Sequence, residues 1–268
     1  QRLVYQAVNM ATCDEQVRQK AIEAGLETLE RKFSTSEVTV TIAIKVLSVM
    51  QGITHNPDPY RARKEQEMAI AEELYDEVKS QYESDFEGCL KLAAAANTMD
   101  FFKDPALVRD EMKKPVAFTI DDSQLLEARL REAKRILYLA DNAGEIYFDL
   151  PFLRWMRRFA EVTYVVKPAP VQNDVTLEDI RKAGLESAFG RVITTGVACP
   201  GVLLALASDE FRQEFASAGL IFTKGMGYYE TLSEYPGVGK VFYCLMAKCQ
   251  PVANALRVPL NSYVAMLR

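Results

Sequence analysis

The chain has 268 residues, of which 49% are apolar, and it carries a formal net charge of −5 at pH 7. This apolar content can bury one large core or two smaller ones, whereas the acidic balance argues against a general nucleic-acid-binding protein. No apolar run approaches the roughly 18 residues of a membrane-spanning helix, so we expect no membrane segment.

Cysteine and histidine contents limit the chemistry further. The five cysteines are scattered and form no CxxC pair, a pattern that favours a reduced, cytoplasmic protein over a disulfide framework. The single histidine, His55, excludes a His-rich zinc site and leaves one candidate for a Ser-His-Asp triad. Hydrolysis by this chain would therefore depend on carboxylates and a hard cation.

Residues 1 to about 130 have a helical pattern. One helix is predicted from the apolar positions Val17, Ala21, Leu26 and Leu29. Asp58-Pro59 predicts the start of another helix, with Asp58 as its N-cap. The apolar stripe of this second helix consists of Ala71, Leu74, Tyr75, Val78 and Tyr82. A third helix covers residues 89–96.

The segment 38–46 is ambiguous, because its apolar residues alternate as in a strand. However, Ser34 and Glu37 form a possible capping box, and the neighbouring segments are helical. We predict a helix here.

After residue 130 the chain contains short β-rich runs separated by helical stretches. The runs are Arg135–Ala140, Val162–Lys167, Arg191–Thr194, Leu220–Thr223 and Lys240–Leu245. Their spacing is typical of strand–helix–strand units, and their continuous apolar character is typical of buried parallel strands. The sequence thus predicts a helical domain over residues 1–130 and an α/β domain with a parallel sheet over residues 131–268.

Polar residues and glycines follow four of these predicted strands. In chain order they are Asp141, Asn142, Gly144 and Glu145; Lys167, Asn173 and Asp174; Thr194, Thr195 and Gly196; and Lys224, Gly225 and Gly227. Ligands of open α/β sheets bind beyond the carboxyl ends of the strands, so these residues line the expected crevice. Thr195 and Gly225 are candidate substrate contacts on this basis.

Asp141 and Asp174 could share one cation if their strands are neighbours and the second loop folds back. Carboxylate and amide oxygens suit Mg²⁺ or Mn²⁺, with Co²⁺ or Ni²⁺ as further candidates. A helix starting near Glu145 would direct its N-terminal amides at an anion, and Lys224 would add a positive charge. Together these groups suit a phosphoryl group.

The same residues also have simpler interpretations. Asp141 and Asn142 could be an N-cap and turn, and Asp174 could cap the helix that follows it. Lys224, followed by glycine, could lie in a surface turn. The sequence alone leaves both sets of interpretations open.

Several segments in order carry a family resemblance. They are NPDPY at Asn56–Tyr60 with Lys64, AANTMD with Asn97 and Asp100, DNAGEIYFD at Asp141–Asp149, NDVT at Asn173–Thr176, KGMGYYETL at Lys224–Leu232 and AKC at Ala247–Cys249. By these motifs the chain resembles the DUF89 family, also called the ARMT1-like or damage-control phosphatase family, in its short archaeal and bacterial branch. One departure is Tyr228, since the family usually has KGxxN here.

The resemblance implies an α-helical N-terminal domain against a Rossmann-like three-layer α/β domain. It also implies a metal-dependent phosphatase acting on phosphorylated metabolites, including sugar phosphates. Among the residues, it implies a metal held by Asp141, Asn142 and Asp174. Glu145 and Lys224 would face the substrate, and the helical domain would line the opposite wall with Asn97 and Asp100.

The working hypothesis is phosphomonoester hydrolysis assisted by one divalent cation, with catalytic roles for Asp141, Asn142, Asp174 and Lys224. The expected ligand is a small phosphorylated metabolite, with no nucleic-acid or membrane partner. Two alternatives remain: an S-adenosylmethionine-dependent carboxyl methyltransferase and a non-catalytic phosphometabolite-binding protein.

Overall fold

The computed structural model describes residues 1–33, 39–98, 105–233 and 240–268. Its helices are α1 (Arg2–Ala11), α2 (Glu15–Lys32), α3 (Thr39–Thr54), α4 (Arg61–Val78), η1 (Lys79–Gln81), α5 (Phe86–Ala96), α6 (Pro105–Met112), α7 (Ser123–Glu132), η2 (Ala143–Glu145), α8 (Ile146–Met156), α9 (Leu177–Lys182), α10 (Glu186–Phe189), α11 (Asp209–Ser217), α12 (Met226–Leu232) and α13 (Gln250–Leu256). Its strands are β1 (Phe118–Asp121), β2 (Arg135–Leu139), β3 (Glu161–Val166), β4 (Val192–Thr194), β5 (Leu220–Lys224), β6 (Val241–Met246) and β7 (Tyr263–Leu267).

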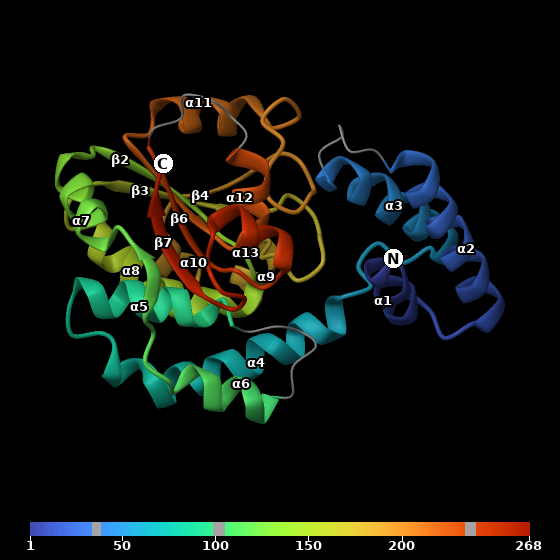
Figure 1. Ribbon diagram of the computed structural model, residues 1–268, viewed down its shortest axis with the longest axis horizontal. Helices are drawn as coiled ribbons and strands as arrows, with labels where there is room; N and C mark the ends of the chain where they lie inside the picture. The colour runs from blue at the N-terminus through green and yellow to red at the C-terminus, as the bar shows by residue number, and fades with distance from the viewer. Residues whose placement is uncertain (34–38, 99–104, 234–239) are drawn as a thin grey trace.

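The described strands form one sheet in the order β1-β7-β6-β5-β2-β3-β4 (Figure 1). The five strands predicted from the sequence, β2 to β6, are confirmed, and every adjacent pair among them is parallel. β7 runs antiparallel to β6 and parallel to β1. The sheet is therefore mostly parallel, as predicted, with two reversed strands at one edge.

Helices cover both faces of the sheet, which confirms the three-layer α/β architecture. One face packs its apolar side chains against α5, α7 and α8, with Tyr138 and Phe222 fully buried, and α4 and α6 extend the same core outward. The other face packs Leu139 and Ile221 against α11, α12 and α13. Figure 1 shows the sheet between α5 and α8 on one side and α11 on the other. Burial on both faces explains the continuous apolar runs of β2, β5 and β6.

The expectation of helix up to about residue 130 was wrong at β1. This strand has only four residues, and its side chains alternate between half-buried and exposed. It lies at the sheet edge and pairs with β7, more than 140 residues further along the chain. A short edge strand has little apolar pattern of its own, so tertiary pairing decides its conformation. Division of the chain at residue 130 remains a prediction.

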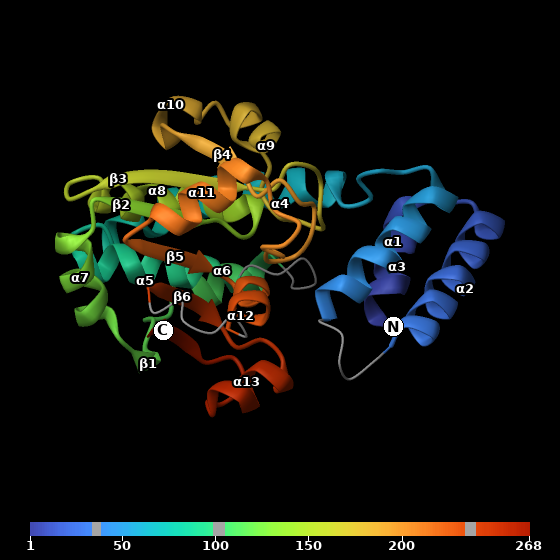
Figure 2. The same cartoon turned by 90° about the horizontal axis from the view of Figure 1, so that it is seen from above.

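The first three helices form a separate helical cluster with its own core. Buried side chains such as Val8, Ala21 and Val46 pack there on one another, away from the sheet. Figures 1 and 2 both show α1, α2 and α3 together at one end of the molecule. Helix α4 extends from this end to the body, where Ala71 and Leu74 join the main core.

The predicted helices around Val17 and over residues 89–96 are confirmed as α2 and α5. From residue 39 on, the ambiguous segment is helix α3, as predicted, whereas residue 38 and Ser34 and Glu37 of the possible capping box lie outside the described residues. None of the helices in the described ranges is long and apolar enough to cross a membrane.

Asp58 does not cap the second predicted helix, which corrects the prediction. Helix α4 begins at Arg61 with Tyr60 at the N-cap position. The amide of Asp58 instead donates to Asn56 Oδ1 at 3.0 Å, and the Arg61 amide donates to the Asp58 carbonyl at 3.3 Å. The Asn56 side chain thus stabilises a turn that competes with an earlier helix start.

Candidate active site

The loop after β3 folds back onto the end of β2. The Val175 amide donates to the Asp141 carbonyl at 2.9 Å, and Asn142 and Asp174 form an isolated antiparallel bridge. β2 and β3 are neighbours, so both conditions for bringing the two acids together are met. Two segments about 30 residues apart in sequence therefore lie side by side at the carboxyl edge of the sheet.

Neither acid is a helix cap, so the simpler interpretation was wrong for Asp141 and Asp174 and holds only for the position of Asn142. Asn142 takes the N-cap position of η2 without a side-chain cap bond. Helix α9 is capped by Thr176, which forms a capping box with Asp179. The carboxylates of Asp141 and Asp174 are consequently available for other interactions.

The Asp141 carboxylate is surrounded by amide donors. Its Oδ2 accepts hydrogen bonds from Asn97 Nδ2 at 3.0 Å and Asn142 Nδ2 at 3.2 Å. Part of the residue stays accessible, yet protein atoms surround the carboxylate. This burial, together with the negative charges of Glu145 and Asp174, raises the pKa of Asp141 well above its usual value. Within the described ranges, no lysine or arginine forms an ion pair with Asp141.

Gly225 allows the Asp141 carboxylate to occupy this position. Its φ of +76° lies in the left-handed region, and a Cβ added there would sit 1.9 Å from Asp141 Oδ2. Glycine is required here both by backbone conformation and by close approach. The predicted close contact at Gly225 is thus with a protein carboxylate; contact with a substrate stays a prediction.

Lys224 is fully buried between two acids. Its Nζ lies 2.5 Å from Glu145 Oε2 and 2.8 Å from Asp149 Oδ1, and all three residues have 0% exposure. Burial opposes the charge of Glu145, but Lys224 outweighs it and lowers the pKa of this carboxyl. For Lys224, too, burial opposes the charge, but the two acids outweigh it and raise the pKa above its usual range. The predicted roles of Glu145 and Lys224 toward a substrate remain predictions.

Asp149 is a site residue that sequence reasoning missed. Tyr138 and Tyr164 donate to its two oxygens at 2.7 and 2.8 Å, which completes the environment of the buried carboxylate. Burial raises the pKa of Asp149 although Lys224 opposes this shift. The signal was its place four residues after Glu145, since this spacing puts two side chains on one helix face.

Asp174 lies against a second buried lysine. Lys167 Nζ is 3.4 Å from Asp174 Oδ2 and also donates to the Gly201 carbonyl. Burial raises the pKa of Asp174 to about 6, although Lys167 opposes the shift. Tyr228, the residue that departs from the family pattern, places its hydroxyl 3.2 Å from Lys167 Nζ and its ring centroid 4.5 Å away.

Lys248 is a cation near the site that the sequence analysis also missed. Its charge acts on both Asp141 and Glu145, and its side chain is half-buried with no ion pair to the residues the structure describes. The main-chain amide of Lys248 lies 3.3 Å from Sδ of Met226. Met226 is the residue that follows Gly225, which contacts Asp141. The AKC motif was the available signal.

No described interaction brings Thr195, a predicted substrate contact, to this cluster. The Thr195 hydroxyl is fully buried and donates to the Val197 carbonyl at 2.8 Å. Asp100 lies outside the described residues. By contrast, Asn97 joins the cluster, since it donates to Asp141 and to Glu145, both at 3.0 Å; its contact with a substrate stays a prediction.

The cluster contains oxygen donors of the kind that a hard divalent cation takes. No group of three or more His, Cys, Asp or Glu side chains suited to a metal occurs in the described part of the chain. Two carboxylates, Asp141 and Asp174, and the amide of Asn142 remain. Asn142 Nδ2 donates to Asp141 Oδ2 and to Glu145 Oε1, so Oδ1 is the atom of this amide left to act as a ligand. Mg²⁺ commonly takes one or two carboxylates and fills its other positions with water and phosphate.

Comparisons with known proteins address the whole chain. The family model described as the damage-control phosphatase ARMT1-like domain matches residues 1–264. A damage-control phosphatase of Pyrococcus horikoshii is 35% identical over 265 residues, covering 97% of this chain and 92% of that protein. A damage-control phosphatase of Archaeoglobus fulgidus is 28% identical over 275 residues, covering 98% and 94%. The crystal structure of a DUF89 family protein from Pyrococcus horikoshii superposes with a TM-score of 0.89 at 34% identity, covering 99% and 95%.

The Gly225→Ala substitution tests the packing against Asp141. Gly184 provides a matched control, because its φ is +67° but nothing lies within 4 Å of an added Cβ. We expect Gly184→Ala to lower the free energy of unfolding by about 1 kcal/mol through backbone strain alone. Gly225→Ala should cost clearly more, because the carboxylate must also move. Urea unfolding of both variants measures this, and equal losses would contradict the interpretation.

Asp141→Asn should stabilise the metal-free protein at pH 8. A raised pKa means that the folded state holds the proton more tightly than the unfolded chain, so ionisation of Asp141 costs stability as pH rises. We expect a gain of about 1 kcal/mol at pH 8, shrinking at pH 5 as the wild-type carboxyl takes up its proton. Urea unfolding in EDTA measures the gain, with the exposed Asp110→Asn as control. A loss of stability at pH 8 would be the contrary result.

Proposed function

Because the chain belongs to the damage-control phosphatase ARMT1-like (DUF89) family, we propose that it hydrolyses phosphomonoesters of small metabolites with the help of a divalent cation. Sugar phosphates or damaged phosphometabolites are the proposed substrates. The observation that carries the proposal is the backbone pairing that puts Asp141-Asn142 beside Asp174 at the carboxyl edge of the sheet.

The proposed cation ligands are the carboxylates of Asp141 and Asp174 and the amide oxygen of Asn142. Mg²⁺ or Mn²⁺ suits these oxygen donors best, with Co²⁺ or Ni²⁺ as alternatives. Such a cation, when bound, supplies charge stabilisation to the phosphoryl oxygens. Burial raises the pKa of both Asp141 and Asp174, and a cation bound between them would favour the ionised form of both.

The two lysines near Asp141 have different proposed roles. Lys224 is fully buried and forms ion pairs with both Glu145 and Asp149, so its proposed role is to offset part of their negative charge. Lys248 is half-buried and has no ion pair to a described residue, so its ammonium group is the one proposed to bind a substrate phosphate. Glu145 accepts from both Asn97 and Asn142 and thereby orients these amides.

Cation dependence is tested by phosphate release with and without EDTA. We expect activity on a panel of phosphorylated metabolites to fall at least about 100-fold in EDTA and to return with Mn²⁺. Asp141→Ala and Asp174→Ala should lose activity to a similar extent, whereas Asp110→Ala, at an exposed position, should retain it. Full turnover in EDTA would contradict cation dependence. Phosphometabolite binding without phosphate release, or methyl transfer from S-adenosylmethionine, would contradict the proposed reaction.

Lys248→Met separates the two lysine roles. Loss of a charge-assisted hydrogen bond to phosphate should lower kcat/KM about 10- to 100-fold, mainly through KM, while the protein stays folded. Lys134→Met is the control, because Lys134 is exposed at the opposite, amino end of β2. Steady-state kinetics with saturating Mn²⁺ measures both variants. An unchanged kcat/KM in Lys248→Met would remove Lys248 from the site.

A further inference from the structure

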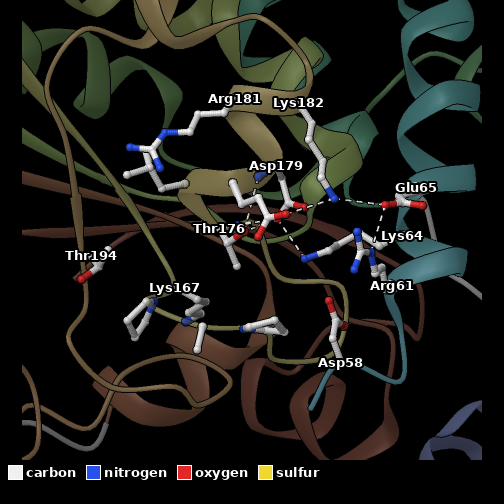
Figure 3. A pocket seen from close by; sticks show the side chains of 15 residues that line it. Asp58, Arg61, Lys64, Glu65, Lys167, Thr176, Asp179, Arg181, Lys182 and Thr194 are labelled. Carbon is white, nitrogen blue, oxygen red and sulfur yellow. Dashed lines mark hydrogen bonds and ion pairs between the residues drawn. The ribbon is translucent and has the colours of Figure 1, made fainter. Parts of the chain in front are cut away.

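Lys64 is a buried lysine that the proposed reaction does not use. It lies in α4, follows the NPDPY segment and is 3% exposed. Its Nζ is 2.9 Å from Asp179 Oδ2 in α9 and forms a buried ion pair there. Figure 3 shows Lys64 pointing from α4 toward Asp179 at the wall of a pocket of about 310 Å³.

The bonds of Lys64 converge on the loop that carries Asp174. Lys64 Nζ also donates to the Asp174 carbonyl at 3.3 Å. Its partner oxygen, Asp179 Oδ2, accepts from the Thr176 amide at 2.7 Å and from the Thr176 hydroxyl at 2.6 Å. One lysine and one carboxylate thus hold residues 174, 176 and 179 together.

The same loop segment pairs with the end of β2 on its other side, through Val175 and Asp174. Lys167 holds the Asp174 carboxylate, whereas Lys64 holds its main chain. The loop is therefore held on one side by backbone pairing with the end of β2 and on the other side by Lys64 of α4. Groups that hydrogen-bond to a metal-binding residue set its orientation. Their loss commonly weakens metal affinity about 10- to 100-fold.

We propose that Lys64 is a positioning residue for the cation site: through the Asp174 carbonyl and Asp179 it holds the Asp174 carboxylate beside Asp141. The proposal rests on the proposed function for the identity of the cation ligands. It assigns to the NPDPY–Lys64 segment a role in metal affinity, although this segment lies in the helical part of the chain.

A merely structural bridge between α4 and α9 is the competing explanation, and the chain offers a matched control for it. Lys182 Nζ lies 3.1 Å from Glu65 Oε1, so this pair joins the same two helices. The pair is exposed, at 41% and 52%, and neither residue forms a described bond to Asp174. Figure 3 shows the two ion pairs next to each other.

The test is the affinity of the full chain for Mn²⁺ alone, measured by isothermal titration calorimetry. Lys64→Met should raise the Kd about 10- to 100-fold, and Lys182→Met should leave it within about twofold. Lys64→Arg, which keeps the charge, should recover part of the affinity. At saturating Mn²⁺, kcat of Lys64→Met should return to within about threefold of the wild type, which a general structural defect would not allow.

Lys64→Met leaves Asp179 as a buried charge without its partner, and removing one partner of a buried ion pair strongly destabilises a protein. A double variant therefore separates an effect on metal affinity from an effect on stability. Lys64→Met/Asp179→Asn removes both charges, and the amide oxygen at position 179 can still accept from Thr176. We expect this variant to unfold near the wild-type urea concentration without metal, yet to bind Mn²⁺ as weakly as Lys64→Met. Wild-type affinity in either folded variant would overturn the proposal, and so would failure of both variants to fold.

The two proposals can fail separately. If the wild-type protein binds no divalent cation, the proposed function fails and this inference fails with it. If the wild type binds Mn²⁺ and releases phosphate while Lys64→Met behaves like Lys182→Met, only the positioning role of Lys64 is wrong.

Discussion

The structure of the site depends on one backbone contact, the pairing between the end of β2 and the segment that returns after β3. The Asn142–Asp174 bridge brings together two acids that the chain separates by more than 30 residues. A second bridge, between Lys167 and Thr176, closes the base of the same loop. Because both strands are parallel neighbours, their carboxyl ends meet at one edge, and the loop needs only to fold back across it.

In the described part of the chain, the acids around this contact fall into two groups, those that pair with a lysine and one that does not. Direct lysine pairs serve the three acids Glu145, Asp149 and Asp174. Among the residues described, Asp141 receives only amide hydrogen bonds, and Gly225 gives its carboxylate the room to sit there. A buried carboxylate without a cationic partner is costly, which agrees with its raised pKa. The proposed cation would complete the balance at this position.

Local signals in the sequence predicted much of this arrangement. Continuous apolar runs located β2 to β6, and the polar residues after them located the site edge, because both depend only on near neighbours in the chain. The resemblance to the DUF89 family is confirmed by the family match over residues 1–264. The sequence predictions that were wrong are those in which a local pattern competes with another contact in the folded protein. Asp58 lost its predicted cap role to the Asn56 turn, and β1 depends on pairing with β7.

The sequence by itself determined which residues form the strands and which acids, amides and lysines follow them, since strand and turn propensities act over a few residues. Only the tertiary structure decided the partners: Lys224 with Glu145 and Asp149, and Lys64 with a loop 110 residues further along the chain. Such pairings depend on strand order and on how α4 packs against η2 and α8. Those are properties of the packed core as a whole, because each element gains stability only by burying its apolar face against another.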